Sequence, residues 1–439
     1  MSTKPFNLSI YNSIKSFKKT IVVDSDKSLS IRSFLIGAIS QNISKVSNVL
    51  ESEDVLSTIE CLKKLGVKIA KIGSGKYLIY GKGLGSLFAK KNLELNFGNS
   101  GTLARLLIGI MSTTPKIEIM IKGDQSLNKR NMGKLIKLME KFGATFIPKD
   151  RFKLPLKLIS SEMPVGIKYE AGVSAQLKSA VILAGLNSYG NTEIIEKMKS
   201  RDHTENMLVK SSKAIQIKYG KKKIIKVYGK GTLAKIDINV PGDPSSAAFF
   251  SALTMLRKDS TLLIKNVGLN QTRIGFYQLL KIHGAKIKFK NLKKKNNEVF
   301  GDIIVKSCNL KPINAPKEYY VKATDEYPIL FVIAALTKGI STFKGIGDLS
   351  NKESDRIKEM QKILKQIGIK SIYTNGKIKI YGQGLLKVKN KTINVPHLDD
   401  HRICMSTVVL ALLTGAKTKI KNFETVFTSS PSFLKIINS

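Results

Sequence analysis

Arginine is scarce in this chain, and its positions are the first sign of chemistry. The 439 residues contain 74 lysines and arginines, of which only nine are arginine. A chain so rich in lysine uses lysine wherever any positive charge suffices, so arginine marks places that need a planar, bidentate group for a carboxylate or phosphate. Seven arginines lie in short polar clusters with Ser, Asp, Asn and Gly: Arg32, Arg105, Arg130, Arg201, Arg273, Arg356 and Arg402. These clusters predict a site for small, multiply anionic molecules.

Some of these arginines have a simpler interpretation. We expect two or three of them to form ion pairs at helix ends or domain interfaces, and we interpret Arg273 as a structural contact. Arg151 and Arg257 lie outside the clusters and are typical of scattered surface charge.

The formal net charge of +42 raises the question of nucleic-acid binding. The lysines are spread along almost every segment, and the sequence has no tryptophan, no basic helix and no aromatic block of the kind found in RNA-binding domains. We therefore attribute the charge to a general bias toward lysine, and we expect no nucleic-acid partner.

The cysteines and apolar runs limit the class of protein further. Cys61, Cys308 and Cys404 match no zinc or disulfide spacing, and with only four histidines a metal site is not expected. The longest apolar runs, such as Ile329–Leu336, are far shorter than the roughly 20 residues that a membrane span requires. We expect a cytoplasmic protein without a membrane segment or an N-terminal signal peptide.

A pattern recurs six times along the chain: an apolar, strand-like run ends in a small polar cluster, and an apolar helix follows. The clusters repeat at intervals of 71 to 80 residues, marked by Ser28, Ser100, Ser174, Ser245, Asp325 and Asp399. Later in most units a glycine closes a helix and an alternating strand follows, as in Leu65-Gly66-Val67. Each unit therefore predicts strand, helix, strand, helix, strand, strand, and a fixed period of this length indicates a repeat architecture.

The polar clusters hold more than helix caps. Ser, Asn and Asp are ordinary N-cap residues, so their presence alone implies nothing about function. Lys27-Ser28 with Arg32, Asn99-Ser100-Gly101-Thr102 with Arg105, and Ser174-Ala175-Gln176 with Lys178 add cations and amides within the first turns. Helix N-termini attract anions, so these additions strengthen the prediction of an anion site.

Taken together and in order, these motifs resemble the enolpyruvyl transferase family over essentially the whole chain. The resemblance also includes Ser200-Arg201-Asp202-His203, Asp325-Glu326, Lys352 to Arg356, and His401-Arg402. It implies a two-domain inside-out α/β barrel built from six βαβαββ repeats. The implied domains are 24–239, and 1–23 with 240–439.

The resemblance is strongest to members that use shikimate 3-phosphate as the acceptor. It implies transfer of the enolpyruvyl group of phosphoenolpyruvate to the 5-hydroxyl of shikimate 3-phosphate, with release of phosphate. No metal or cofactor is implied, and a monomer is expected. The first domain would bind mainly shikimate 3-phosphate, and the second would carry the catalytic acid and part of the phosphoenolpyruvate site.

The same resemblance assigns roles to individual residues. The implied catalytic residues are Asp325, Glu353 and Lys27. The implied ligands of shikimate 3-phosphate are Lys27, Ser28, Arg32, Ser174, Ala175, Gln176, Ser200, Asp325 and Lys352. The implied ligands of phosphoenolpyruvate are Lys27, Gly101, Arg130, Gln176, Arg356 and Arg402.

The chain departs from the family pattern in places, and two other functions are open. Asp24-Ser25 stands where the family usually has Pro-Gly, and the lysine of one subclass is absent near Thr428. A UDP-N-acetylglucosamine enolpyruvyl transferase would pair its lysine with Asn and carry a loop cysteine, whereas Ser28 follows Lys27 and 123–132 has no cysteine. A nucleic-acid-binding or RNA-end-processing protein is the more distant alternative.

Overall fold

The computed structural model describes residues 5–385 and 391–439, which form two compact units. The internal unit consists of Ser25–Val240 and Lys295–Glu298. The terminal unit consists of Met1–Asp24, Pro241–Lys294 and Val299–Ser439. The chain thus leaves the terminal unit after Asp24 and re-enters it at Pro241.

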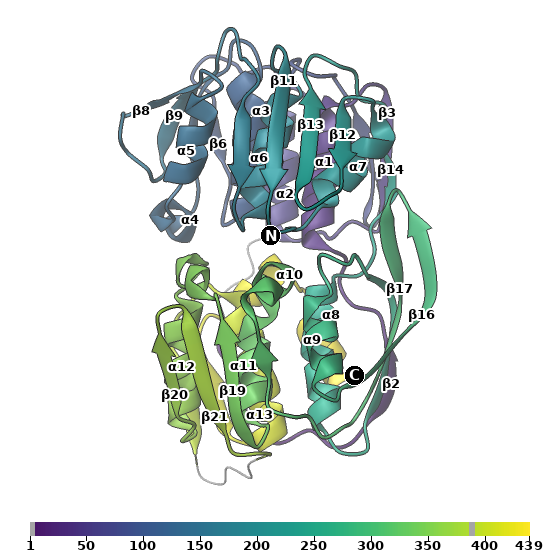
Figure 1. Cartoon of the computed structure of the whole chain (residues 1–439), viewed down its shortest axis with the longest axis vertical. Helices are drawn as coiled ribbons and strands as arrows, with labels where there is room; N and C mark the ends of the chain where they lie inside the picture. Colours follow the sequence, from purple (N-terminus) through teal and green to yellow (C-terminus); the bar gives the residue numbers. More distant parts are fainter. Residues whose placement is uncertain (1–4, 386–390) are drawn as a thin grey trace. The chain divides into compact units, whose positions relative to one another are not determined.

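Each unit contains three small sheets (Figure 1). The internal sheets have the strand orders β14-β3-β5-β4, β6-β7-β9-β8 and β10-β11-β13-β12. Their strands are β3 (Ile43–Ser47), β4 (Lys68–Gly73), β5 (Lys76–Tyr80), β6 (Glu94–Asn96), β7 (Glu118–Lys122), β8 (Thr145–Ile147), β9 (Leu156–Ile159), β10 (Lys168–Ala171), β11 (Asn191–Glu196), β12 (Ile215–Lys218), β13 (Lys223–Tyr228) and β14 (Asp237–Asn239).

The terminal unit repeats this arrangement, with the orders β16-β17-β15-β2, β18-β19-β21-β20 and β1-β23-β22. Its strands are β1 (Leu8–Ile10), β2 (Lys18–Ile21), β15 (Thr261–Gly268), β16 (Lys286–Lys295), β17 (Glu298–Lys306), β18 (Asn314–Ala315), β19 (Gly339–Lys344), β20 (Ser371–Thr374), β21 (Lys377–Gly382), β22 (Thr392–Val395) and β23 (Lys417–Ile420). The predicted strand–helix repeat and the α/β class are confirmed.

The first and the fourth repeats exchange their first strands. β2 precedes the first repeat in sequence, yet it pairs in parallel with β15 of the fourth repeat. β14 precedes the fourth repeat and pairs in parallel with β3 of the first. The chain passes from one unit to the other just after each of these strands. β2 therefore completes a sheet of the terminal unit, and β14 completes a sheet of the internal unit.

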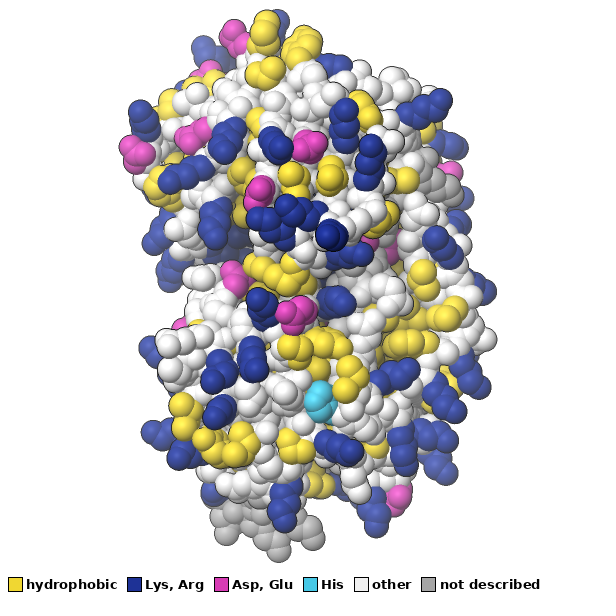
Figure 2. Space-filling model, viewed as in Figure 1, with side chains coloured by type: hydrophobic (Ala, Val, Ile, Leu, Met, Phe, Trp, Pro, Cys, Tyr) yellow, Lys and Arg dark blue, Asp and Glu magenta, His cyan; other side chains and the backbone are white. Residues whose placement is uncertain are grey.

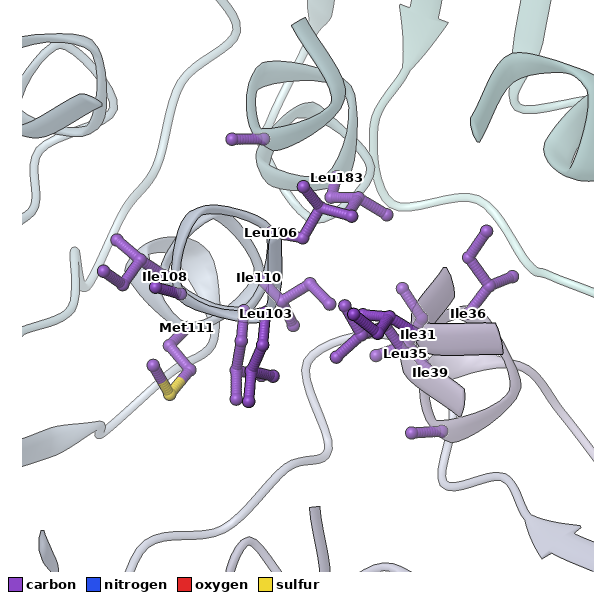
Figure 3. Packing of buried hydrophobic residues seen from close by; sticks show 14 of the residues in the cluster. Ile31, Leu35, Ile36, Ile39, Leu103, Leu106, Ile108, Ile110, Met111 and Leu183 are labelled. Carbon is purple, nitrogen blue, oxygen red and sulfur yellow. The ribbon is translucent and has the colours of Figure 1, made fainter. Parts of the chain in front are cut away.

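Three apolar helices form the centre of each unit. In the internal unit these are α1 (Lys27–Ile39), α3 (Gly101–Thr113) and α6 (Ala175–Gly185), and in the terminal unit α8 (Pro244–Leu256), α11 (Tyr327–Ala335) and α13 (His401–Thr414). Nearly every residue of these helices is buried, as expected for helices that are apolar on all sides. Figure 3 shows side chains of α1, α3 and α6, and α3 contacts both of the other helices.

Each unit also contains further helices within the described residues. They are α2 (Glu53–Lys64), α4 (Gln125–Lys129), α5 (Gly133–Glu140), α7 (His203–Ser211), α9 (Gly275–Ile282), α10 (Tyr320–Ala323), α12 (Arg356–Gln366) and α14 (Phe433–Asn438), with the 3-10 turns η1 (Lys317–Tyr319), η2 (Thr324–Glu326), η3 (Gly347–Asn351) and η4 (Phe423–Thr428). Several, such as α2 and α12, bury only one face. No helix within the described residues is long and apolar enough to cross a membrane.

Four charged side chains lie buried where α6, α7, β11 and β13 meet: Lys178, Glu196, Glu205 and Lys223, here called the charge cluster. Lys178 Nζ lies 2.8 Å from Glu196 Oε1 and 2.7 Å from Glu205 Oε1. Lys223 Nζ lies 3.3 Å from Glu196 Oε2 and 3.0 Å from Glu205 Oε1. None of the four side chains is more than 2% exposed. Because burying an unpaired ion is costly, each of the four depends on the others.

The charge cluster makes stability depend on pH. Burial alone would raise the pKa of Glu205, but the ammonium groups of Lys178 and Lys223 lower it to about 2. A carboxyl group with a lower pKa in the folded than in the unfolded state stabilises the fold above its unfolded pKa. That stabilisation is lost as the pH falls through the folded pKa.

We expect Glu205→Gln to lower the free energy of unfolding near pH 7 by about 3–5 kcal/mol, because it leaves a buried positive charge uncompensated. The difference in free energy of unfolding between variant and wild type should shrink as the pH falls from 4.5 to about 2, because Glu205 itself becomes protonated in this range. Denaturant unfolding at a series of pH values measures it. Glu170→Gln is the control, since Glu170 and its partner Lys197 are both 63% exposed. A difference that is independent of pH would contradict the prediction.

Candidate functional site

The first polar cluster lies at the start of α1 in the internal unit. Asp26 caps the helix by accepting a hydrogen bond from Leu29 N at 2.8 Å, which places Lys27 and Ser28 in the first turn. Lys27 Nζ forms an ion pair with Asp54 Oδ2 at 3.0 Å. The ammonium group is thus held beside a helix N-terminus, where free N–H groups also favour an anion.

Arg32 lies one helical turn further, and its guanidinium group makes hydrogen bonds to three oxygen atoms of α1, α6 and α7. Its Nη1 donates to Ser28 O at 3.1 Å and its Nε to Thr204 Oγ1 at 2.9 Å. Nη2 lies 3.4 Å from Ser179 Oγ. The side chain is only 4% exposed. These hydrogen bonds fix the direction in which the guanidinium group points.

Two guanidinium groups flank Gly101 at the start of α3. Arg105 Nη1 donates to Gly101 O at 3.0 Å, and Arg130 Nη2 donates to Asn99 Oδ1. A Cβ atom on Gly101 would lie 2.7 Å from Arg105 Nη1 and 3.0 Å from Arg130 Nη1. The absence of a side chain therefore allows both cations to approach one helix N-terminus, which is a strong anion-binding arrangement.

Gln176 connects this helix end to that of α6. Ser174 caps α6, and Gln176 lies in the first turn. Gln176 Oε1 accepts from Arg105 Nη1 at 2.8 Å, and Nε2 donates to Thr102 Oγ1 at 3.0 Å. Two motifs of successive repeats are thereby joined in space.

Ser200 is buried against the charge cluster and is 1% exposed. Its N and Oγ both donate to Glu196 Oε1, at 2.9 Å and 2.6 Å. The only proton of the hydroxyl is therefore already donated to a carboxylate. Three residues on, His203 Nδ1 lies 2.8 Å from Glu298 Oε1.

In the terminal unit three carboxylates surround Arg356. Nε donates to Asp400 Oδ2 at 2.9 Å, Nη2 donates to Glu353 Oε2 at 2.6 Å, and Nη1 lies 3.6 Å from Asp325 Oδ1. Burial alone would lower the pKa of Arg356, but these carboxylates raise it. Asp325 and Glu353 are each 24% exposed, whereas Arg356 is 1% exposed. The arginine thus holds together two partly accessible carboxylates, which are suited to proton transfer.

Arg402 lies at the start of α13, with its guanidinium carbon 5.8 Å from the ring centre of Phe249. Its backbone N donates to the N-cap residue Asp400, and its side chain is 4% exposed. Within the described residues its Nε and Nη1 make no hydrogen bond. Since buried donors are nearly always satisfied, this guanidinium group is a candidate to bind an anionic ligand.

Lys352 interacts with its own neighbours. Its Nζ lies 2.5 Å from Asp348 Oδ2 and 6.0 Å from the centre of the Tyr320 ring. Tyr320 donates to the same carboxylate oxygen at 2.8 Å. Lys352 is 25% exposed, so this ion pair is partly open to solvent.

The structure therefore groups the predicted residues within each unit. The internal unit brings together Lys27, Ser28, Arg32, Gly101, Arg130, Ser174, Ala175, Gln176 and Ser200 at the starts of its central helices or against them. The terminal unit brings together Asp325, Lys352, Glu353, Arg356 and Arg402.

Comparison with known proteins identifies the family. The family model described as EPSP synthase (3-phosphoshikimate 1-carboxyvinyltransferase) matches residues 11–437. The chain belongs to the EPSP synthase family. The 3-phosphoshikimate 1-carboxyvinyltransferase of Zymomonas mobilis is 38% identical over 416 residues, which cover 94% of this chain and 91% of the relative. That of Paramagnetospirillum magneticum is 36% identical over 419 residues, covering 95% and 93%.

Solved structures agree with this membership. EPSP synthase from Acinetobacter baumannii superposes with a TM-score of 0.83 at 36% identity, covering 98% of this chain and 97% of that one. The enolpyruvyl transferase NikO from Streptomyces tendae has a TM-score of 0.72 at 13% identity, which shows a shared fold only. The predicted family, fold and enzyme class are confirmed.

Several partners of the candidate site residues were not predicted from the sequence. Asp54, which pairs with Lys27, lies in a separate helix, and Thr204, which orients Arg32, is 172 positions away. Asp400 could have been found, because it stands in the sixth repeat marker beside His401-Arg402. Arg273 forms a buried ion pair with Asp243 at 3.0 Å, as its interpretation as a structural contact requires.

Residues 5–385 and 391–439 contain no group of three or more His, Cys, Asp or Glu that could hold a metal ion. On the face seen in Figure 2, Lys and Arg side chains are spread widely, with acidic and apolar side chains among them. This distribution agrees with a general bias toward lysine.

Proposed function

We propose that this chain transfers the enolpyruvyl group of phosphoenolpyruvate to the 5-hydroxyl of shikimate 3-phosphate and releases phosphate, a step of aromatic amino acid (chorismate) biosynthesis. The observation that carries the proposal is the family match over 11–437, which includes every polar cluster described above. The named relatives at 36–38% identity are 3-phosphoshikimate 1-carboxyvinyltransferases, which supports this acceptor over UDP-N-acetylglucosamine.

Shikimate 3-phosphate is bound mainly by the internal unit, which carries Lys27, Ser28, Arg32, Ser174, Ala175, Gln176 and Ser200, with Asp325 and Lys352 from the terminal unit. The fixed orientation of Arg32, held by the hydroxyls of Thr204 and Ser179, supports a phosphate-binding role, because a guanidinium group binds phosphate best in a defined geometry. Ser200 acts differently from Arg32, since its hydroxyl proton is donated to Glu196. It can accept a hydrogen bond from a ring hydroxyl, or it can hold the turn before α7.

Phosphoenolpyruvate carries a phosphate and a carboxylate, and both need cations. Lys27 and Arg130 supply cations in the internal unit, where the backbone at Gly101 and the amide of Gln176 add neutral donors. Arg356 and Arg402 supply cations in the terminal unit. Three features support these roles: the paired guanidinium groups beside Gly101, the helix N-terminus between them, and the unfilled buried donors of Arg402.

The reaction is an addition followed by an elimination. The substrate 5-oxygen attacks C2 of the enol while C3 gains a proton, and the tetrahedral adduct then loses phosphate and a proton from C3. Asp325 takes the hydroxyl proton, and Glu353 and Lys27 move the proton at C3. Arg356 orients both carboxylates, at 3.6 Å from Asp325 and 2.6 Å from Glu353. No metal or cofactor takes part.

The protein acts as a monomer in the cytoplasm. Light scattering of the purified protein tests the oligomeric state.

The proposed function is tested by phosphate release from purified protein with phosphoenolpyruvate and either shikimate 3-phosphate or UDP-N-acetylglucosamine. We expect release with shikimate 3-phosphate alone. Release with only the nucleotide sugar would overturn the acceptor, and release with neither would overturn the activity. A gel shift with RNA at physiological ionic strength tests the nucleic-acid alternative, and we expect none.

Asp325→Asn should lower turnover by about 100- to 10,000-fold, because an amide cannot accept the hydroxyl proton and general-base catalysis contributes about 10²–10⁴. Binding of shikimate 3-phosphate, measured by calorimetry, should stay within a few-fold of the wild type. Asp259→Asn is the control, since Asp259 is exposed and its left-handed backbone (φ 57°) also suits Asn. Near-normal turnover of Asp325→Asn would remove this residue from the mechanism.

Gly101→Ala should raise the KM for phosphoenolpyruvate by about tenfold or more, because the added methyl group displaces Arg105 and Arg130. Since Gly101 is unsubstituted, we also expect glyphosate to inhibit the wild-type enzyme in competition with phosphoenolpyruvate, and the variant to be less sensitive. Steady-state kinetics measure both effects. Gly220→Ala is the control, because a Cβ there would meet nothing closer than 3.8 Å. An unchanged KM in Gly101→Ala would contradict the assignment of this glycine.

A further inference from the structure

Two consecutive residues of α6 contact two consecutive residues of α7. Lys178 Nζ lies 2.7 Å from Glu205 Oε1, and Thr204 Oγ1 donates to Ser179 Oγ at 2.8 Å. All four side chains are at most 1% exposed. An ion pair and a hydroxyl pair in adjacent positions hold α6 and α7 in one register, because a shift of either helix would break both.

Arg32 of α1 is attached to this junction. Its Nε donates to Thr204 Oγ1 at 2.9 Å, and its Nη2 lies 3.4 Å from Ser179 Oγ. The hydroxyl of Thr204 thus accepts from Arg32 and donates to Ser179. The direction of the Arg32 guanidinium group therefore depends on where Thr204 and Ser179 lie.

The other end of the charge cluster holds Ser200. Glu196 Oε1 accepts from Lys178 Nζ as well as from the N and Oγ of Ser200. Lys223 of β13 pairs with both glutamates of the cluster. The segment that leads from β11 into α7 is therefore tied to the same four charges as the α6–α7 junction.

We propose that the charge cluster of Lys178, Glu196, Glu205 and Lys223 positions the side chains that bind shikimate 3-phosphate, and so sets the affinity for that substrate rather than for phosphoenolpyruvate. The inference rests on the proposed function. The cluster contacts Ser200 directly and reaches Arg32 through the hydroxyls of Ser179 and Thr204, the neighbours of Lys178 and Glu205.

The effect is selective because α6 and α7 are held differently. α6 packs extensively against α3 and is joined to it through Gln176, Arg105 and Thr102, so it keeps its place when the cluster is removed. α7 has few contacts with α6 apart from this junction. Loss of the junction therefore displaces Thr204, while Ser200 stays bonded to Glu196 and the guanidinium groups beside Gly101 stay in position.

Charges suit this role better than apolar side chains. Apolar cores accept small shifts and rearrangements, whereas buried ions are stable only at short distances from their partners. Replacing a buried ion pair by a pair of neutral side chains is often tolerated in stability. A positioning role can therefore be separated from a stabilising one by removing one positive and one negative charge together.

The test is the double variant Lys178→Met/Glu205→Met, which removes the ion pair between the helices and leaves the Lys223–Glu196 pair and the acceptor of Ser200. We expect the variant to fold, with the KM and calorimetric Kd for shikimate 3-phosphate raised at least tenfold and the KM for phosphoenolpyruvate within twofold of wild type. Lys197→Met/Glu170→Met removes an ion pair of 3.0 Å between side chains that are each 63% exposed, and it should change neither KM.

Thr204→Val provides a second test without altering any charge. It keeps the side-chain shape but removes the hydroxyl that orients Arg32, and we expect a three- to tenfold rise in KM for shikimate 3-phosphate only. In the triple variant, the rise in KM for shikimate 3-phosphate should be smaller than the product of the two separate rises, since both changes act through Arg32. If the double variant does not fold, an unchanged KM in Thr204→Val overturns the proposal.

The other outcomes are equally decisive. A folded double variant with wild-type KM values, or with both KM values raised equally, would overturn the positioning role and leave the proposed function intact. A wild-type protein that releases no phosphate with shikimate 3-phosphate would overturn the proposed function and this inference together.

Discussion

A helix that is surrounded by protein on all sides can carry unpaired polar groups only at its ends. This constraint governs both units, because α1, α3 and α6 in one and α8, α11 and α13 in the other are buried almost completely. Their N-terminal ends are where backbone N–H groups are unsatisfied and where cations, amides and small residues collect. Polar chemistry is thus confined to the helix starts, and apolar packing determines where those starts lie.

The two units use this constraint for different chemistry. At the helix starts of the internal unit, cations and neutral donors predominate around Arg32 and Gly101, and such groups bind anions. In the terminal unit, Arg356 is enclosed by Asp325, Glu353 and Asp400, so its charge is largely balanced and two carboxylates remain partly accessible. One set is suited to holding phosphate, and the other to moving protons.

Other buried charged groups are paired within the protein. Lys178 of α6 is compensated by Glu196 and Glu205, and Arg273 is compensated by Asp243. Such groups contribute little net stability because desolvation offsets their attraction. Because these ion pairs are stable only at short distances, they fix the positions of the elements that carry them. For this reason we link the charge cluster to substrate binding and not to folding alone.

The sequence by itself determined the features that depend on local chemistry and spacing. The strand–helix repeats follow from hydrophobic periodicity, and the polar clusters at helix starts follow from residue type, so the six units and the clusters are predictable from residue order. The roles of single residues within the clusters came from the resemblance to the enolpyruvyl transferase family. Only the tertiary structure decided which residues became partners. Lys27 with Asp54, Arg32 with Thr204, and the exchange of β2 and β14 join segments 27 to more than 200 positions apart. Contacts of this kind depend on how whole helices and sheets pack, and no local pattern encodes that packing.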